Sequence, residues 1–412
     1  MVENELNLGQ ELASIGGLAA SIQTIITMRD ALDNKLDKIS DIWNNYIWEY
    51  KFCNSKIKFT PDVKSNYFGD ILSYFSDTFN LIYNNKKADS FSDNIEISIS
   101  FLQAIYIQQD FIEELLHIFK CDLDKGDLKK DINYSVNREL RNELVGHPIR
   151  KSDINGTRQL LSSTIFSNST NADQISYLRY HLDNNYKFEE VTHSKESILK
   201  RHSAFIEFYF DIIIEKLKGI LSLFKIKIEE IEKVVANAPF ENVVKIVSDS
   251  FEYIFKTDHL YKPDILLQVY KLRNTNRRYA NAFELFQRDL NQFLFDKKQD
   301  INEIIRDTDR HSLTQTDEEI ILPEIIFTES NEKVDTSKIA VSYHYELGKL
   351  VDRSDITKFR FFSSLLKSKC KDKELVLAEI ENMEMNLDNT LEYYCSFHLV
   401  DKELNDMENT SR

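Results

Sequence analysis

The segment 138–148 holds the residues whose types and spacing are best suited to chemistry. In it, Arg141 and Asn142 are followed, after four intervening residues, by His147. Arginine supplies a permanently charged, bidentate clamp for a phosphate and for the charge that develops on it in a transition state. Histidine exchanges a proton near neutral pH with a ribose hydroxyl or a leaving oxygen, and asparagine can orient either partner. The three side chains therefore indicate RNA chemistry that needs no metal ion and no other cofactor.

The neighbouring residues predict how this motif is held. A helix is expected over 127–145, and Gly146 and Pro148 end it, because the residue before a proline is pushed out of the helical region. His147 should therefore lie just beyond the helix C-terminus. On a continuous helix it would point away from Arg141, whereas the break lets its imidazole turn back toward the guanidinium.

At these residues the chain resembles the HEPN superfamily, whose members are helical bundles with an Arg–polar–x(3–5)–His signature at a helix end. The signature here is Arg141-Asn142-x4-His147. The resemblance implies a metal-independent endoribonuclease that acts as a homodimer, with two copies of the motif facing each other in one cleft. It also implies that Arg141 and His147 are catalytic, that Asn142 positions them, and that the protein is a toxin or a phage-defence effector.

Two other functions stay open at this point. The chain can be a non-catalytic helical module that binds a protein partner, in which case the motif is only a helix end. It can also be a HEPN protein that binds a nucleotide. A second match to the signature, Arg306-Asp307-x3-His311, lies at the edge of a polar segment without an apolar helical pattern, so the first match is preferred.

The charge of the chain limits how it can bind RNA. The sequence has 52 Lys and Arg against 68 Asp and Glu, a net charge of -16. Proteins that coat nucleic acid are basic, because neutralisation of phosphates drives that binding, so any RNA contact must be a local site. Over 120–158 the balance reverses, with nine basic and seven acidic residues. The basic residues beside the motif are the candidate substrate contacts: Arg138, Arg150, Lys151 and Arg158.

Composition and apolar spacing favour an all-α fold. The 412 residues are 42% hydrophobic, enough for a sizeable core, and include only 9 Gly and 5 Pro, too few for an all-β fold. Apolar residues recur at helical spacing over 95–119 and 213–231. Asp93 and Glu96 predict a capping-box start for the first of these helices.

The segment 174–193 departs from the helical pattern. Two short β-prone runs flank the turn Asp183-Asn184-Asn185, which predicts a β-hairpin with the polar segment 151–173 as the loop leading into it. The expected organisation has four regions: 1–235, a HEPN-like antiparallel helical bundle with the loop and hairpin near 150–193; 236–306, further helices; 307–336, a polar linker; and 337–412, C-terminal helices.

The remaining features favour a cytoplasmic protein. Residues 1–10 contain two Glu and no basic residue, unlike a secretory signal. The uncharged segment 12–28 is at the short limit for a membrane span and contains polar residues and Gly, so a helix packed on a neighbour is predicted. The four cysteines occur singly, as reduced thiols of a cytosolic protein do. The expected partners are RNA, a second copy of the chain and, for a toxin, an inhibitory or sensor protein; no membrane and no metal site are predicted.

Overall fold

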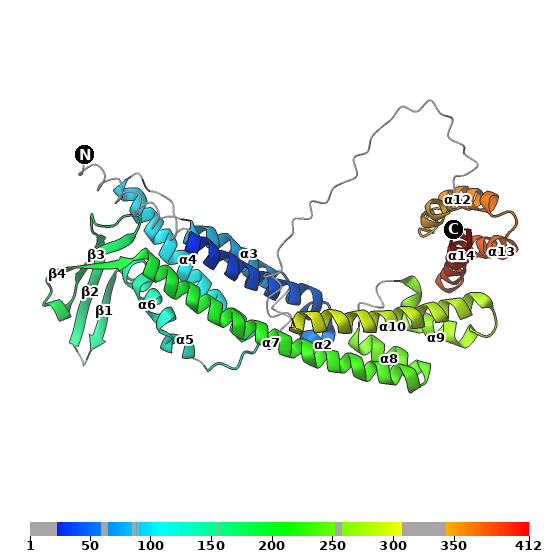
Figure 1. Cartoon of the computed structure of the whole chain (residues 1–412), viewed down its shortest axis with the longest axis horizontal. Helices are drawn as coiled ribbons and strands as arrows, with labels where there is room; N and C mark the ends of the chain where they lie inside the picture. Colours follow the sequence, from blue (N-terminus) through cyan, green and yellow to red (C-terminus); the bar gives the residue numbers. More distant parts are fainter. Residues whose placement is uncertain are drawn as a thin grey trace, which may run out of the picture. The chain divides into compact units, whose positions relative to one another are not determined.

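The computed structural model describes residues 23–58, 65–84, 88, 90–124, 126–154, 157–251, 258–306 and 343–411. Most of these residues are helical, as the composition predicts (Figure 1). As far as they are described, their contacts form two compact units, Met1–Trp48 with Cys53–Leu221, and Glu49–Phe52 with Ser222–Arg412. Among the described helices, none combines the length and the apolar character that a membrane crossing requires.

The first unit combines helices with one sheet. Its helical elements are a helix over 23–42, the π-helical turn η1 (Trp43–Ile47), the second half of α2 (Lys51–Asn54), α3 (Ser65–Tyr83), α4 (Phe91–Ile118), α5 (Asp127–Lys130), α6 (Ile132–Arg141), the π-helical turn η2 (Asn142–Gly146) and the first part of α7 (Lys195–Asn237). α4 packs against both α3 and α6. Phe210 of α7 packs on Phe75 of α3, with ring centroids 5.3 Å apart, and Phe205 of α7 packs on Tyr134 of α6 at 5.4 Å. These contacts place the motif at the end of a helix held by its neighbours.

α4 begins earlier than predicted. The capping box uses Ser90, whose hydroxyl accepts a hydrogen bond from the backbone N–H of Asp93, while the Asp93 carboxylate accepts one from the backbone N–H of Ser90. The expectation that Asp93 starts the helix was therefore wrong by one turn. Within the predicted apolar stripe Leu102 and Ile112 are fully buried, whereas Ile99 is 37% exposed.

The second predicted stripe is confirmed along α7. Its six apolar residues are at most 4% exposed: Ile213, Leu217, Ile220, Phe224, Ile228 and Ile231. The two units divide between Leu221 and Ser222, inside the continuous helix α7. The sequence predicts a domain boundary further along the chain, near residue 235. No turn residue marks the division, because one helix supplies apolar residues to both cores. The predicted linker 307–336 lies outside the described residues.

The predicted hairpin is present as part of a larger sheet. Within the described residues, four antiparallel strands follow one another in the order β1 (Ile149–Ile154), β2 (Thr157–Phe166), β3 (Gln174–Tyr180) and β4 (Phe188–Ser194). β3 and β4 form the expected hairpin. The expectation that 151–173 is a loop was wrong, because most of this segment belongs to β1 and β2. The two strands are stabilised by pairing with each other, and the polar sequence Arg-Lys-Ser-Asp gives no local signal for a strand.

The second unit is helical in its described part. Its elements are α8 (Phe240–Ser250), the 3-10 turn η5 (His259–Tyr261), α9 (Pro263–Leu272), α10 (Arg277–Arg306), α11 (His344–Lys349), α12 (Ile356–Lys369), α13 (Glu374–Met385) and α14 (Thr390–Ser411). α14 packs against α10 and α13. Arg278 of α10 lies 3.2 Å from Glu379 of α13 and 3.0 Å from Glu392 of α14, so one largely buried guanidinium joins three helices.

A buried polar chain connects three helices of the first unit. The Nε2 of His202 in α7 is 2.8 Å from Oε1 of Gln108 in α4, and Nε2 of Gln108 donates to Oγ1 of Thr78 in α3 at 2.8 Å. Because the amide oxygen can only accept, Nε2 of His202 must carry a proton. Burial lowers the pKa of His202 from 6.5 to about 3.

This histidine should make the first unit sensitive to acid. Between pH 6.5 and about 3 the unfolded chain binds a proton that the folded chain excludes, so the free energy of unfolding falls as the pH falls. The uptake of one proton on unfolding changes the free energy of unfolding by up to about 1.4 kcal/mol per pH unit. His202→Gln keeps an N–H donor but cannot titrate, and should make the pH dependence between pH 6 and 4 shallower by that amount. Urea unfolding followed by tryptophan fluorescence measures this, since Trp43 and Trp48 both lie in the first unit. The exposed His117→Gln is the control, and an equal change in slope for both variants would refute the prediction.

Candidate functional site

The predicted helix over 127–145 is divided into three pieces. α5 ends at Lys130, and Asp131 is extended (φ -72°, ψ 119°) before its carboxylate caps α6 through the backbone N–H of Asn133. α6 continues into η2, where the backbone N–H of His147 donates to the carbonyl of Asn142 at 2.7 Å. The helix ends there, with His147 at φ -139° and ψ 61°, so the prediction that His147 lies just beyond a helix end is confirmed. Such π-helical turns are frequent at functional sites.

The Arg141 side chain is held on several sides. Its Nε and Nη2 donate to Oε1 of Gln103 at 3.0 and 2.9 Å, and its Nη1 donates to Oδ1 of Asn142 at 3.1 Å. The guanidinium carbon lies 3.9 Å from the centre of the Tyr106 ring. Contacts with described residues thus use three of the five N–H bonds of the guanidinium. One N–H on each terminal nitrogen is left for an anion such as a phosphate.

Gly146 makes room for this guanidinium. A β-carbon at position 146 would overlap Nη1 of Arg141 and would lie 3.3 Å from its Cζ and 3.4 Å from Oδ1 of Asn142. The backbone at Gly146 is not in the left-handed region, so the site uses the missing side chain and not the conformational freedom of glycine. Gly146 therefore ends the helix, and its missing side chain also leaves the space that the guanidinium of Arg141 occupies.

The imidazole of His147 is exposed to solvent. Pro148 follows it, and β1 begins at Ile149. No described residue forms a hydrogen bond or an ion pair with the imidazole. The structure therefore joins Asn142 to the guanidinium of Arg141 and leaves His147 available to an external partner.

Arg138, a predicted substrate contact, makes internal contacts. Its Nη2 lies 2.7 Å from Oδ1 of Asp110, and its guanidinium carbon lies 4.0 Å from the centre of the Tyr106 ring. The guanidinium carbon of Arg141 is equally close to the centre of that ring, at 3.9 Å. Tyr106 therefore contacts two cations. Arg138 is 20% exposed and positions Tyr106, which positions Arg141.

Glu143 connects η2 to the sheet, a contact that is not predicted from the sequence. The hydroxyl of Tyr177 in β3 donates to Oε2 of Glu143 at 3.0 Å, and Nε of Arg179 lies 3.4 Å from Oε1. Burial, followed by the charge of Glu143, raises the pKa of Tyr177, so the phenol stays protonated and remains a donor at neutral pH. The position of Glu143 between two motif residues is the one signal by which it can be found in the sequence.

The other predicted substrate contacts lie in the strands that follow the motif. Arg150 and Lys151 belong to β1, and Arg158 of β2 pairs with Asp153 of β1. Their side chains lie outside the described part of the structure. Of the alternative motif, Arg306 ends α10 and His311 lies outside the described residues.

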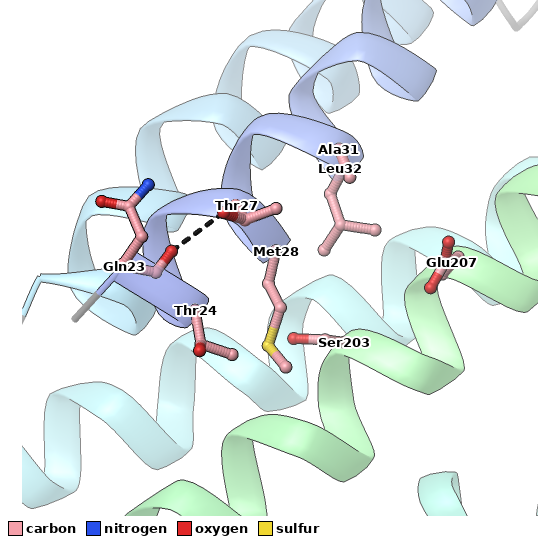
Figure 2. A pocket seen from close by; sticks show the side chains of 8 residues that line it. All are labelled: Gln23, Thr24, Thr27, Met28, Ala31, Leu32, Ser203 and Glu207. Atoms are coloured by element: carbon pink, nitrogen blue, oxygen red, sulfur yellow. Dashed lines mark hydrogen bonds between the residues drawn. The ribbon is translucent and has the colours of Figure 1, made fainter. Parts of the chain in front are cut away.

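A cavity of about 540 Å³ lies between the helix over 23–42 and α7 (Figure 2). Two of its polar side chains bind other residues of the chain: the Ser203 hydroxyl is 3.0 Å from that of Tyr83, and Glu207 is 3.2 Å from Nζ of Lys35. Its lining includes none of the motif residues. The motif is therefore the better candidate site.

The described residues include no group of three or more His, Cys, Asp or Glu side chains arranged to hold a metal ion. The chain matches no protein-family model, no curated protein and no solved structure. The geometry of the motif is thus the basis on which a function is proposed.

Proposed function

We propose that this chain is a metal-independent endoribonuclease of the HEPN type with its active site at 141–147. One observation carries the proposal: a guanidinium fixed by Gln103 and Asn142 keeps two N–H bonds for an anion and lies on the turn that ends at an exposed histidine. Metal-free phosphodiester cleavage needs a group that stabilises negative charge on the phosphate and a group that transfers a proton, and an arginine and a histidine supply them. The bundle of α3, α4, α6 and α7 agrees with the helical fold that the family resemblance implies.

The reaction is a transesterification within RNA. The imidazole of His147 removes the proton of a ribose 2′-hydroxyl, the 2′-oxygen attacks the neighbouring phosphorus, and the bond from phosphorus to the 5′-oxygen breaks. The two remaining N–H bonds of Arg141 bind the nonbridging oxygens and stabilise their growing negative charge. Asn142 positions the guanidinium. The products are a 2′,3′-cyclic phosphate and a 5′-hydroxyl that has taken up one proton.

A homodimer is part of the proposal. A single imidazole cannot remove one proton and donate another in the same step, so a second copy facing the first supplies the proton for the leaving oxygen. As a toxin or phage-defence effector, the enzyme also needs an inhibitory or sensor partner that controls it.

The test is cleavage of total RNA and tRNA by the purified chain in EDTA. The native chain should produce cyclic-phosphate ends, the Arg141→Ala/His147→Ala variant should be inactive, and Arg306→Ala/His311→Ala should cleave like the native chain. Equal cleavage by the native chain and the first variant would contradict the assignment of the motif.

A protein-interaction module is the second candidate. It is favoured by exposed aromatic residues in the second unit, where Tyr345 is 65% and Phe361 is 60% exposed. In that case the motif variants would bind the partner as the native chain does. A nucleotide-binding HEPN protein would bind nucleotide at the motif and release no cleaved RNA, which product analysis distinguishes.

A further inference from the structure

Three aromatic rings gather at the end of the β3–β4 hairpin. The ring centroid of Tyr180 lies 5.2 Å from that of Tyr186 and 5.4 Å from that of Phe188. Phe188 is 62% exposed and Tyr186 is 37% exposed, so the cluster faces solvent. The buried residues Ile175 and Tyr177 lie on the opposite face of β3. The aromatic cluster therefore belongs to the outer, solvent-facing side of the sheet.

The register of the sheet connects this cluster to the strand that follows the motif. Ile149 pairs with Ser162, Ser162 with Tyr180, and Tyr180 with Phe188. Directly paired residues share one face, so the four residues form a row across the sheet. The row spans three strand spacings, about 14 Å. It ends at Ile149, which is 66% exposed and lies two residues after His147.

The backbone keeps one of these rings in place at a cost. Tyr186 has φ 54° and follows Asn185 at φ 55°. A left-handed conformation is unfavourable for a bulky residue, and asparagine tolerates it better. The hydrogen bond from the backbone N–H of Tyr186 to the carbonyl of His181, 2.8 Å long, holds this turn. The chain thus keeps an exposed tyrosine where its backbone favours asparagine or glycine.

We propose that the aromatic cluster of Tyr180, Tyr186 and Phe188 binds unpaired bases of single-stranded RNA by stacking, on the outer face of the sheet whose first strand begins two residues after His147. This inference rests on the proposed function and names its substrate class. Aromatic rings stack on any base, because every base has a π-face, and each stacked base adds to the affinity for a single strand. A duplex hides the faces of its bases, so the cluster selects single-stranded RNA.

The charge of the chain supports stacking as the source of affinity. With a net charge of -16, the molecule as a whole repels RNA, and the electrostatic attraction that dominates non-specific binding is weak here. Glu189 and Glu190 in β4 itself add to that repulsion. RNA affinity that comes from stacking on aromatic rings should therefore decrease little as the salt concentration rises.

The test measures RNA binding without cleavage. The full chain with His147→Ala is titrated into a labelled 12-nucleotide single strand and into the matching duplex, and fluorescence anisotropy is read. The single strand should bind at least about tenfold more tightly than the duplex. Added to this background, Phe188→Leu should weaken single-strand binding about tenfold, whereas Phe188→Tyr, which keeps a ring, should bind within twofold.

Tyr186→Asn separates stacking from folding. It removes a ring and relieves the left-handed backbone, so binding should fall about tenfold while thermal stability stays equal or rises. The control is Phe295→Leu, which alters a 53% exposed phenylalanine of the second unit and should leave RNA binding unchanged.

Several results would overturn the inference. They are absence of binding to either RNA, equal binding of the duplex, or full affinity in Phe188→Leu. Dissociation of a dimer in size-exclusion chromatography by the same variants, with RNA affinity intact, would identify the cluster as a surface for a second copy instead. Because binding is measured without cleavage, ring-dependent binding by a chain that cuts no RNA would refute the proposed nuclease alone, and cleavage with ring-independent binding would refute this inference alone.

Discussion

Arg141→Lys should slow RNA cleavage about 10²- to 10³-fold, although the positive charge is kept. The guanidinium uses three N–H bonds on Gln103 and Asn142 and its carbon lies 3.9 Å from the centre of the Tyr106 ring, while two N–H bonds remain for the phosphate. An ammonium group has three donors on one atom, so it cannot bind both supports and still offer two parallel donors. Initial rates on a labelled RNA, at saturating and subsaturating concentrations, measure the loss in kcat and in kcat/KM.

The matched control for this substitution is Arg29→Lys. Arg29 is partly exposed and pairs with Asp33 on its own helix at 3.3 Å, away from the motif in sequence and in contacts. It should cleave RNA at the native rate. A rate for Arg141→Lys within threefold of the native chain would show that charge alone is sufficient and that the supported geometry has no catalytic role.

Gly146→Ala should lower cleavage about 10²-fold and leave the free energy of unfolding unchanged or slightly higher. The added methyl group would overlap Nη1 of Arg141, which is the end of a flexible side chain and can move aside. Displacement of a catalytic group by about 1 Å is enough for such a loss. In a helical turn alanine is also favoured over glycine by about 0.5–1 kcal/mol, so the fold should not suffer. Cleavage rates and urea unfolding of the same preparation measure both effects.

Gly219→Ala provides the comparison. Gly219 lies in α7, and apart from the backbone of its own helix and its two chain neighbours nothing lies within 4 Å of where its β-carbon would be, so the substitution adds the same methyl group without touching the motif. It should gain similar stability and keep full activity. If Gly146→Ala cleaves RNA as fast as Gly219→Ala, the guanidinium does not act from the position that the structure gives it.

Much of the fold can be predicted from the sequence because the signals are local. The spacing of Ile213, Leu217 and Phe224 specifies a buried helical face, and those residues are buried. Gly146 and Pro148 specify where a helix ends, and His147 lies there. In both cases the physical cause, a periodic apolar face or a residue that cannot continue a helix, acts within a few positions along the chain.

The tertiary structure decided what surrounds the motif. Gln103 and Tyr106, which hold Arg141, lie 38 and 35 residues before it on another helix, and no local pattern links them. The strands β1 and β2 pair although their sequences are polar, and only their register places Ile149 in one row with Tyr180. Such contacts are stabilised by packing between elements, whose free energy depends on which surfaces meet in space. The motif could therefore be located from the sequence, while the supports that make its arginine a fixed clamp follow from the packing of α4 and the sheet around it.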